Sequence, residues 1–204
     1  MKGQKISSKK LILGVTGSFG SGKTTVAKMF KSCGAKIIDA DKVSHALLRP
    51  ETQVYRTIVK TFGKGILKKD GTVNRRQLGR IVFSNKSLLE KLNSIMHPEV
   101  IRIIKKKLNE TKDGIIILDA PLILETGRRD LADKLIVVKT TIAEQIKRIQ
   151  KKSTLTKKEI LNRIKSQIPF KRKLRLADFV IDNDGTLQET RKQVTLIRRV
   201  LWKS

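Results

Sequence analysis

Short apolar runs recur along the chain and are separated by longer segments of mixed polarity. The five runs lie at residues 11–16, 35–41, 114–121, 134–140 and 177–183. Each run is short, mostly apolar and rich in β-branched residues, which favours a buried strand over a helix. The segments between them, such as residues 22–32 and 141–150, favour helices. Buried strands that alternate with helices predict an α/β fold with a five-stranded parallel sheet flanked by helices.

Two further segments have a helical pattern. The long stretch at about residues 42–111 is mostly helical in character, with one turn at Asp70-Gly71. Near the C-terminus, Leu187, Val194, Ile197 and Leu201 recur at helical spacing. This spacing predicts that the four side chains pack in the core.

Glycine and carboxylate residues stand at the ends of three predicted strands. Gly17 ends the first strand, Asp39 and Asp41 end the second, and Asp119 ends the third. Ligands of parallel α/β sheets bind at the carboxyl ends of the strands. We therefore expect these residues to share one site.

Residues 17–24, GSFGSGKT, match the phosphate-binding pattern G-x-x-x-x-G-K-[ST] at every fixed position. The backbone N–H groups of such a loop, and the helix that follows it, bind phosphate oxygens. Lys23 is placed to reach the β- and γ-phosphates and is also a candidate catalytic residue. The hydroxyl of Thr24 is a candidate Mg²⁺ ligand. The candidate ATP-binding residues of the loop are Gly17, Gly20, Ser21, Gly22, Lys23, Thr24 and Thr25.

Three aspartates are candidates for the chemistry beside the phosphates. Asp119 follows four apolar residues, a pattern typical of the aspartate that organises Mg²⁺ in such folds. Asp39 and Asp41 would point to the same side of an extended segment, so that one could act as a base on an acceptor hydroxyl. Alternatively, Asp41 caps a helix that starts near Lys42.

The chain has 204 residues and a formal net charge of +28. Such a charge is compatible with nucleic-acid binding. However, the basic residues are spread over the whole chain and aromatic residues make up only 4%, whereas nucleic-acid sites usually add stacking aromatics. We therefore expect no obligatory nucleic-acid partner, and a nucleic-acid-binding ATPase is the less favoured alternative.

The sequence also gives expectations about the cellular compartment and the domain organisation. No apolar run reaches 18 residues, so we expect no membrane partner. Residues 1–10 predict a basic N-terminal tail rather than a signal peptide. The single cysteine, Cys33, excludes an internal disulfide and fits a cytoplasmic protein. We expect residues 11–204 to form a single unit that is monomeric or a small homo-oligomer.

Five motifs, in this order along the chain, resemble those of the dephospho-CoA kinase family. They are the phosphate loop with the preceding Gly14-Val15-Thr16, then Ile38-Asp39-Ala40-Asp41, His97-Pro98, PLILE at 121–125 and ADFVIDN at 177–183. The resemblance implies a P-loop kinase core with a helical acceptor-binding insertion and a lid. It implies transfer of the ATP γ-phosphate to the ribose 3′-hydroxyl of dephospho-CoA, with Mg²⁺ as cofactor. The products would be CoA and ADP.

The resemblance also implies roles for residues of the chain. The helical region at about 42–111 would bind the acceptor, and residues 148–175 would hold the lid. Asp41 would be the acceptor-side base, and Arg148 would reach the ATP phosphates. The acceptor-binding residues would be Asp39, Arg75 and His97, and the metal-binding residues would be Thr24 and Asp119.

Some readings stay open at this point. His97-Pro98 could simply end a helix, and Arg148 could belong to a solvated basic face with Lys147 and Lys151. Lys152 stands where the family commonly has a second lid arginine, and lysine lacks the two-pronged geometry of arginine. Another small-molecule P-loop kinase, acting on a nucleoside monophosphate or a sugar acid, is the main alternative function.

Overall fold

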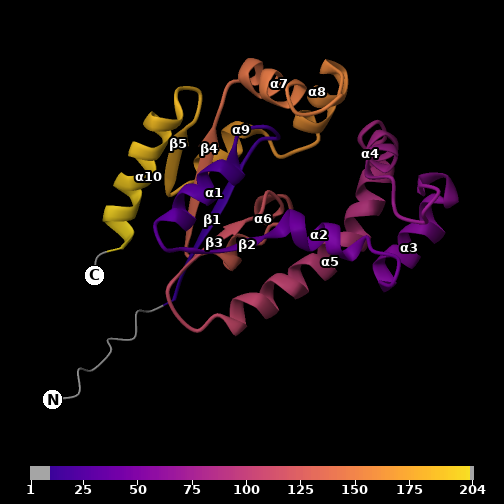
Figure 1. The fold of residues 1–204 in the computed structure, drawn as a ribbon, viewed down its shortest axis with the longest axis horizontal. Coiled ribbons are helices and arrows are strands. Elements are labelled where there is room, and N and C mark those ends of the chain that lie inside the picture. The colour runs from indigo at the N-terminus through magenta and orange to yellow at the C-terminus, as the bar shows by residue number, and fades with distance from the viewer. Residues whose placement is uncertain (1–9, 203–204) are drawn as a thin grey trace.

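A five-stranded parallel sheet forms the centre of the molecule (Figure 1). The computed structural model describes residues 10–202. The strands, in the order in which they lie in the sheet, are β2 (Lys36–Asp39), β3 (Ile115–Asp119), β1 (Leu11–Gly17), β4 (Lys134–Lys139) and β5 (Phe179–Asp182). Every neighbouring pair is parallel. The predicted fold class and all five predicted strands are confirmed.

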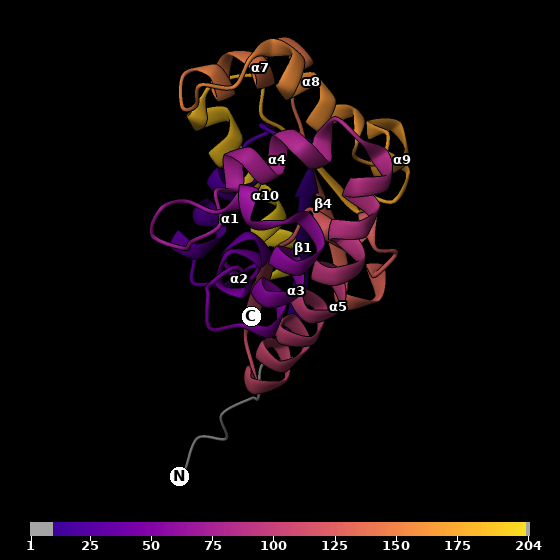
Figure 2. The ribbon, with the colours of Figure 1, turned by 90° about the vertical axis from the view of Figure 1, so that its right-hand side faces the viewer.

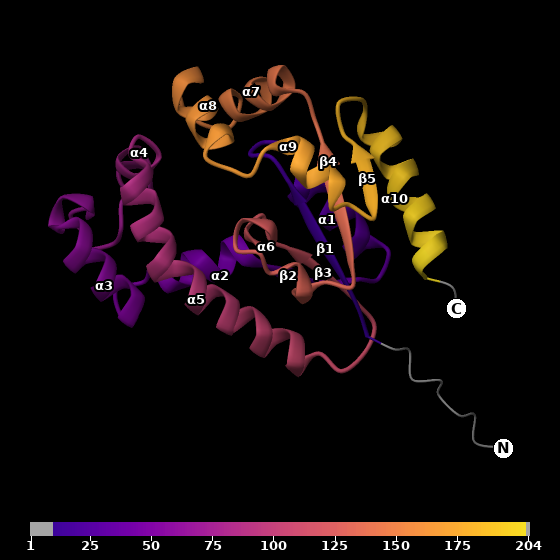
Figure 3. The ribbon, with the colours of Figure 1, turned by 180° about the vertical axis from the view of Figure 1, so that it is seen from behind.

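Helices cover both faces of this sheet (Figures 1 and 3). The α-helices are α1 (Lys23–Ser32), α2 (Ala40–Leu47), α3 (Gln53–Phe62), α4 (Arg75–Phe83), α5 (Lys86–Glu110), α6 (Leu122–Glu125), α7 (Ile142–Gln150), α8 (Lys157–Lys165), α9 (Phe170–Arg175) and α10 (Leu187–Leu201). Two short 3-10 helices span Lys64–Ile66 and Arg129–Leu131. Within residues 10–202 no helix combines the length and the apolar character that crossing a bilayer requires.

Alternate residues of the central strands face opposite layers. Leu118 and Val137 pack with the side of the sheet that α2 to α5 cover, whereas Val15 and Ile136 pack with α1 and α10. All four side chains are fully buried. Because successive side chains of a strand point to opposite faces, a strand buried on both faces must be apolar throughout. This requirement explains the continuous apolar runs in the sequence.

The strand register brings the polar strand ends together. Asp119 of β3 lies opposite Val15 of β1 on one side and opposite Asp39 of β2 on the other. Gly17, two residues beyond Val15, begins the phosphate loop. The expectation that these ends meet at one edge of the sheet is therefore confirmed.

Helices α2 to α5 project to one side of the sheet, whereas α7 and α8 lie above its carboxyl edge (Figures 1 and 2). We call α2 to α5 the acceptor region and residues 148–175 the lid segment, after the predictions made for them. An ion pair joins the two, because the Arg80 Nε of α4 lies 2.9 Å from Glu159 Oε1 of α8. The proposed roles of both regions, and their boundaries, stay predictions. The predicted N-terminal tail, apart from Lys10, lies outside the described residues.

Two local readings of the sequence are wrong. Helix α5 continues through Pro98, so His97-Pro98 does not end a helix. The proline removes one backbone hydrogen bond. Met96 and Val100 lie buried on either side of it, and their burial stabilises the helix. Leu187 is 64% exposed and starts α10, whereas Val194 and Ile197 are buried as predicted.

Candidate active site

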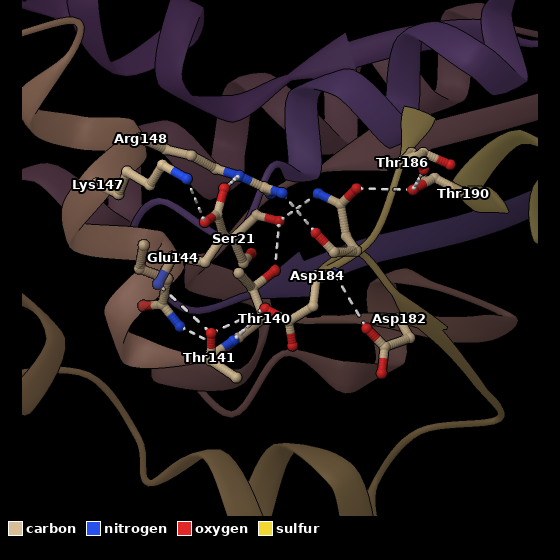
Figure 4. Close-up of polar contacts among 12 residues, drawn as sticks. Ser21, Thr140, Thr141, Glu144, Lys147, Arg148, Asp182, Asp184, Thr186 and Thr190 are labelled. Atoms are coloured by element: carbon tan, nitrogen blue, oxygen red, sulfur yellow. Dashed lines mark hydrogen bonds and ion pairs between the residues drawn. The ribbon is translucent and has the colours of Figure 1, made fainter. Parts of the chain in front are cut away.

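The phosphate loop joins β1 to α1 and is fixed from two other elements. The Thr140 hydroxyl, just after β4, and the Asn183 amide, just after β5, donate hydrogen bonds to the Ser21 carbonyl at 3.0 and 2.8 Å (Figure 4). Thr190 of α10 in turn donates to Asn183 Oδ1 at 2.8 Å. Gly22 precedes α1 with φ 89°, and a Cβ there would collide with the Asn183 amide. The left-handed backbone and the close amide both require glycine.

A cavity of about 760 Å³ opens over this loop, and we call it the loop cavity. Five predicted ATP-binding residues of the loop line it: Gly20, Gly22, Lys23, Thr24 and Thr25. Asp41 and Arg148 also line it. The structure therefore brings the predicted base and the predicted lid arginine to the same cavity as the phosphate loop.

The Lys23 ammonium donates a hydrogen bond to the Ser18 carbonyl of its own loop at 3.0 Å. Burial lowers the pKa of Lys23, while the nearby carboxylates of Asp119 and Asp41 oppose that shift. The ammonium is thus held over the loop by a neutral carbonyl and attracted by two acids. Phosphate oxygens compete well for such a cation, because charge-assisted hydrogen bonds are stronger than neutral ones.

Thr24 and Asp119 contact each other directly. The Thr24 hydroxyl donates to Asp119 Oδ2 at 3.1 Å, and Asp119 is only 5% exposed. Burial raises the pKa of Asp119 to about 6, against the opposing effects of Lys23 and of the hydrogen bond from Thr24. A buried carboxylate whose charge is this poorly compensated, next to a hydroxyl, is a suitable place for a hard cation.

Asp39 and Asp41 do not lie as the sequence suggested. The extended segment ends at Asp39 and α2 begins at Ala40, so the two carboxylates do not share one side of a strand. Asp39, not Asp41, caps α2, because its Oδ1 accepts from the Lys42 N–H at 2.9 Å. Asp41 lies in the first helical turn and remains available to the loop cavity.

A second cavity of about 440 Å³, which we call the edge cavity, lies along β2. Asp39 and Asp119 line it, and Thr24 lines both cavities. The Thr24–Asp119 pair therefore stands at the boundary between the two.

Arg148 of α7, which lines the loop cavity, is held by two contacts (Figure 4). Its Nε donates to Glu144 Oε1 at 2.9 Å, and its Nη2 donates to the Asn183 carbonyl at 2.7 Å. The side chain is half-buried. These contacts contradict the alternative that Arg148 is one member of a solvated basic face. Lys152 also lines the loop cavity.

Arg75 and His97 line neither the loop cavity nor the edge cavity. Arg75 starts α4, and its Nη1 contacts His45 Nε2 of α2. His97 is half-buried within α5, and burial lowers its pKa while the charge of Glu125 opposes that shift. The structure thus places Arg75 beside His45 of α2, which comes four residues after Asp41 in the chain. It places His97 near Glu125.

Within residues 10–202 no cluster of three or more His, Cys, Asp or Glu side chains is arranged to hold a metal ion by itself. Mg²⁺ in phosphoryl-transfer sites is usually bound by one or two protein groups together with substrate phosphates and water. The pair of Thr24 and Asp119 fits that smaller set.

The family model described as dephospho-CoA kinase matches residues 11–189. The chain belongs to the dephospho-CoA kinase family. A dephospho-CoA kinase of Carboxydothermus hydrogenoformans is 43% identical over 196 residues, which cover 94% of this chain and 95% of the relative. Among solved structures, a Thermus thermophilus protein aligns with TM-score 0.77 at 29% identity, covering 95% of this chain and 99% of that one. A dephospho-CoA kinase from Campylobacter jejuni aligns with TM-score 0.60 at 30% identity, covering 94% and 97%.

Burial and contacts single out two residues to which the sequence alone gives no role. Lys173 of α9 is fully buried, and its ammonium lies 2.8 Å from Glu125 Oε1 and 3.5 Å from the Gly17 carbonyl. Glu125 also accepts from the Ile168 N–H at 2.9 Å. Glu125 belongs to the PLILE motif at 121–125, where the sequence alone assigns no role to the carboxylate. No local signal marks Lys173 among the many lysines of this chain.

Proposed function

We propose that this protein transfers the γ-phosphate of ATP to the ribose 3′-hydroxyl of dephospho-CoA, giving CoA and ADP. One observation carries the proposal: Asp41 and Lys23 line the same cavity over a complete phosphate loop, in a chain of the dephospho-CoA kinase family. A phosphoryl transfer needs a cation on the moving phosphoryl group and an oxygen base on the acceptor hydroxyl. These two residues provide both.

Each residue of the loop cavity has a separate task in this proposal. The backbone from Gly17 to Gly22 and the side chains of Lys23 and Thr25 bind the phosphates. Arg148 reaches the phosphates from the lid segment. Asp41 accepts the proton of the 3′-hydroxyl. The oxygen of this hydroxyl forms a bond to the γ-phosphorus, while the bond from that phosphorus to the ADP oxygen breaks.

Mg²⁺ is the proposed cofactor, and Thr24 and Asp119 are the proposed residues that hold it. Asp119 would bind the ion directly or through a water molecule. When bound, the ion neutralises charge on the phosphate oxygens. The raised pKa of Asp119 supports this assignment, because a nearby cation would relieve the electrostatic cost of the buried carboxylate.

The acceptor region is proposed to bind dephospho-CoA. Asp39, Arg75 and His97 are its candidate binding residues, and the contact between Arg75 and His45 fixes the arginine close to α2. The partners we propose are therefore two small anionic molecules, ATP and dephospho-CoA, with no obligatory nucleic acid. A cytoplasmic location fits this biosynthetic role.

The most direct test is mass-spectrometric detection of CoA after the protein is incubated with ATP, Mg²⁺ and dephospho-CoA. The Lys23→Ala variant, which loses the proposed phosphate ligand, is the matched control for traces of a contaminating kinase. We expect CoA with the wild-type chain and almost none with the variant. Turnover of a sugar acid or a nucleoside monophosphate, with none of dephospho-CoA, would refute the assignment. ATP hydrolysis stimulated by nucleic acid and suppressed by salt would favour a nucleic-acid-binding ATPase instead.

A further inference from the structure

Arg163 of α8 contacts two aromatic rings that belong to different parts of the molecule. Its guanidinium carbon lies 5.3 Å from the ring centroid of Phe19, in the phosphate loop, and 4.8 Å from that of Phe83, at the end of α4. Both distances are within the range of cation–π attraction. Arg163 also lines the loop cavity. The lid segment, the phosphate loop and the acceptor region therefore meet at this one side chain.

The acceptor region leaves space for this guanidinium. Gly79 is a buried residue inside α4, where glycine is less favourable than alanine. A Cβ at Gly79 would lie 3.0 Å from Arg163 Nη2, which is closer than ordinary van der Waals contact. The absence of a side chain at this position thus lets Arg163 lie against the helix.

No carboxylate holds Arg163 in place within residues 10–202. Glu159, one turn earlier on α8, forms its ion pair with Arg80 of α4 instead. Burial lowers the pKa of Arg163, with only the charge of Glu159 opposing it. The half-buried guanidinium is therefore held mainly by the two rings and by the surface of α4.

Phe19 is fixed to the lid segment at a second point. Its backbone N–H donates to Gln167 Oε1 at 2.8 Å, so both the ring and the backbone of Phe19 contact residues of the lid segment. Phe19 lies in the middle of the loop pattern GSFGSGKT. A shift of Arg163 would therefore change the position of the loop that binds phosphate.

We propose that Arg163 is a positioning residue that links the acceptor region to the phosphate loop, through Phe83 on one side and Phe19 on the other. Arg163 itself need not touch a substrate. The acceptor region, when it is docked on Arg163, holds the phosphate loop in its ATP-binding form. The inference deepens the proposed function, on which its consequence for acceptor binding rests.

The first test measures ATP affinity in a double-mutant cycle and needs no acceptor. Phe83 lies on α4, and in the proposal it influences the loop only through Arg163. We expect Phe83→Leu to weaken binding of a non-hydrolysable ATP analogue about 3- to 10-fold in the wild-type background, the range of a partly buried cation–π contact. In the Arg163→Leu background the same change should have no further effect. Equal effects in both backgrounds would overturn the proposal.

The second test measures coupling between the two substrates by calorimetry. The ATP analogue should raise the affinity for dephospho-CoA in the wild-type chain, and Arg163→Leu should reduce this increase at least fivefold. Arg163→Lys, which keeps the cation, should restore part of it. Arg172→Leu removes an exposed arginine of α9 and should leave the coupling unchanged. Wild-type coupling in Arg163→Leu would contradict a positioning role.

Two controls separate this inference from its alternatives. Thermal unfolding shows whether Arg163→Leu is folded, and the cycle is read only from variants that unfold cooperatively. If Arg163→Leu does not fold, the cycle uses Arg163→Lys, in which a smaller effect of Phe83→Leu is expected and an undiminished effect would again overturn the proposal. If dephospho-CoA is not a substrate, the proposed function fails, but the ATP-affinity cycle still tests Arg163.

Discussion

Asp119→Asn should stabilise the metal-free protein, although it removes a carboxylate that we propose to hold Mg²⁺. The pKa of Asp119 is about 6, against an ordinary value of 3.8, so ionisation of the folded protein is unfavourable by about two pKa units. Two units correspond to about 3 kcal/mol. This net value already includes the attraction of Lys23. Asparagine keeps an oxygen that accepts from the Thr24 hydroxyl but carries no charge.

The sign of the pH dependence follows from linkage. Below pH 3.8 the carboxyl is protonated in both the folded and the unfolded chain, so its charge costs nothing. Between pH 3.8 and about 6 the unfolded chain releases the proton while the folded chain retains it, and the free energy of unfolding falls. Above that window the full cost is present. The stabilisation by Asp119→Asn should therefore grow through this window and stay constant at higher pH.

Urea unfolding in EDTA, at intervals from pH 4 to pH 8, measures this effect. We expect Asp119→Asn to raise the free energy of unfolding at pH 7.5 by about 3 kcal/mol, or the melting temperature by roughly 6–12 °C. Asp113→Asn is the matched control, because Asp113 is 66% exposed and its carboxylate forms a surface ion pair with Lys36. A gain that is equal at all pH values, or a loss of stability at pH 7.5, would refute the reasoning. With Mg²⁺ and ATP the order should reverse, since the variant binds the complex less tightly.

Substitutions at three further residues test the site. Asp41→Asn should lower kcat about 10²- to 10⁴-fold, as expected for loss of a general base, with ATP affinity almost unchanged by calorimetry; near-normal turnover would place the base elsewhere. His45→Leu should raise the KM for dephospho-CoA about tenfold, because Arg75 loses its contact, while His45→Gln, which offers an amide oxygen, should restore most of it; an equal rise in both variants would count against this role. Gly22→Ala should abolish ATP binding and lower the melting temperature, because its Cβ would collide with Asn183, and an unchanged ATP affinity would show that the loop tolerates a side chain there.

The sheet and the phosphate loop were predictable because their signals are local. A short apolar run, or a fixed spacing of glycines and a lysine, depends on neighbouring residues alone. The alternative in which Asp41 caps α2 is wrong because both Asp39 and Asp41 precede Lys42, where the sequence predicts the helix to start, and only the backbone shows that the helix begins at Ala40. The continuation of α5 through Pro98 depends on packing against α2, α3 and α4, which local preference does not contain.

Lys173 and Arg163 were not predictable because their roles depend on contacts across long stretches of sequence. Lys173 meets Glu125, 48 residues away, and Arg163 meets Phe19 and Phe83. In a chain with 46 Lys and Arg residues, composition cannot distinguish these two from solvated lysines and arginines. Only burial and geometry do.

Lys23 and Lys173 both contact backbone carbonyls of the phosphate loop, but they differ in their other contacts, and this difference predicts different roles. Lys173 is fully buried and its ammonium lies 2.8 Å from the Glu125 carboxylate, so its charge is matched within the protein. Lys23 donates instead to the neutral Ser18 carbonyl. A phosphate would have to displace a carboxylate from Lys173 but only a carbonyl from Lys23, and the second exchange is far more favourable. Lys173 therefore fixes the start of the loop at Gly17, and we expect Lys23 to be available to the substrate phosphates.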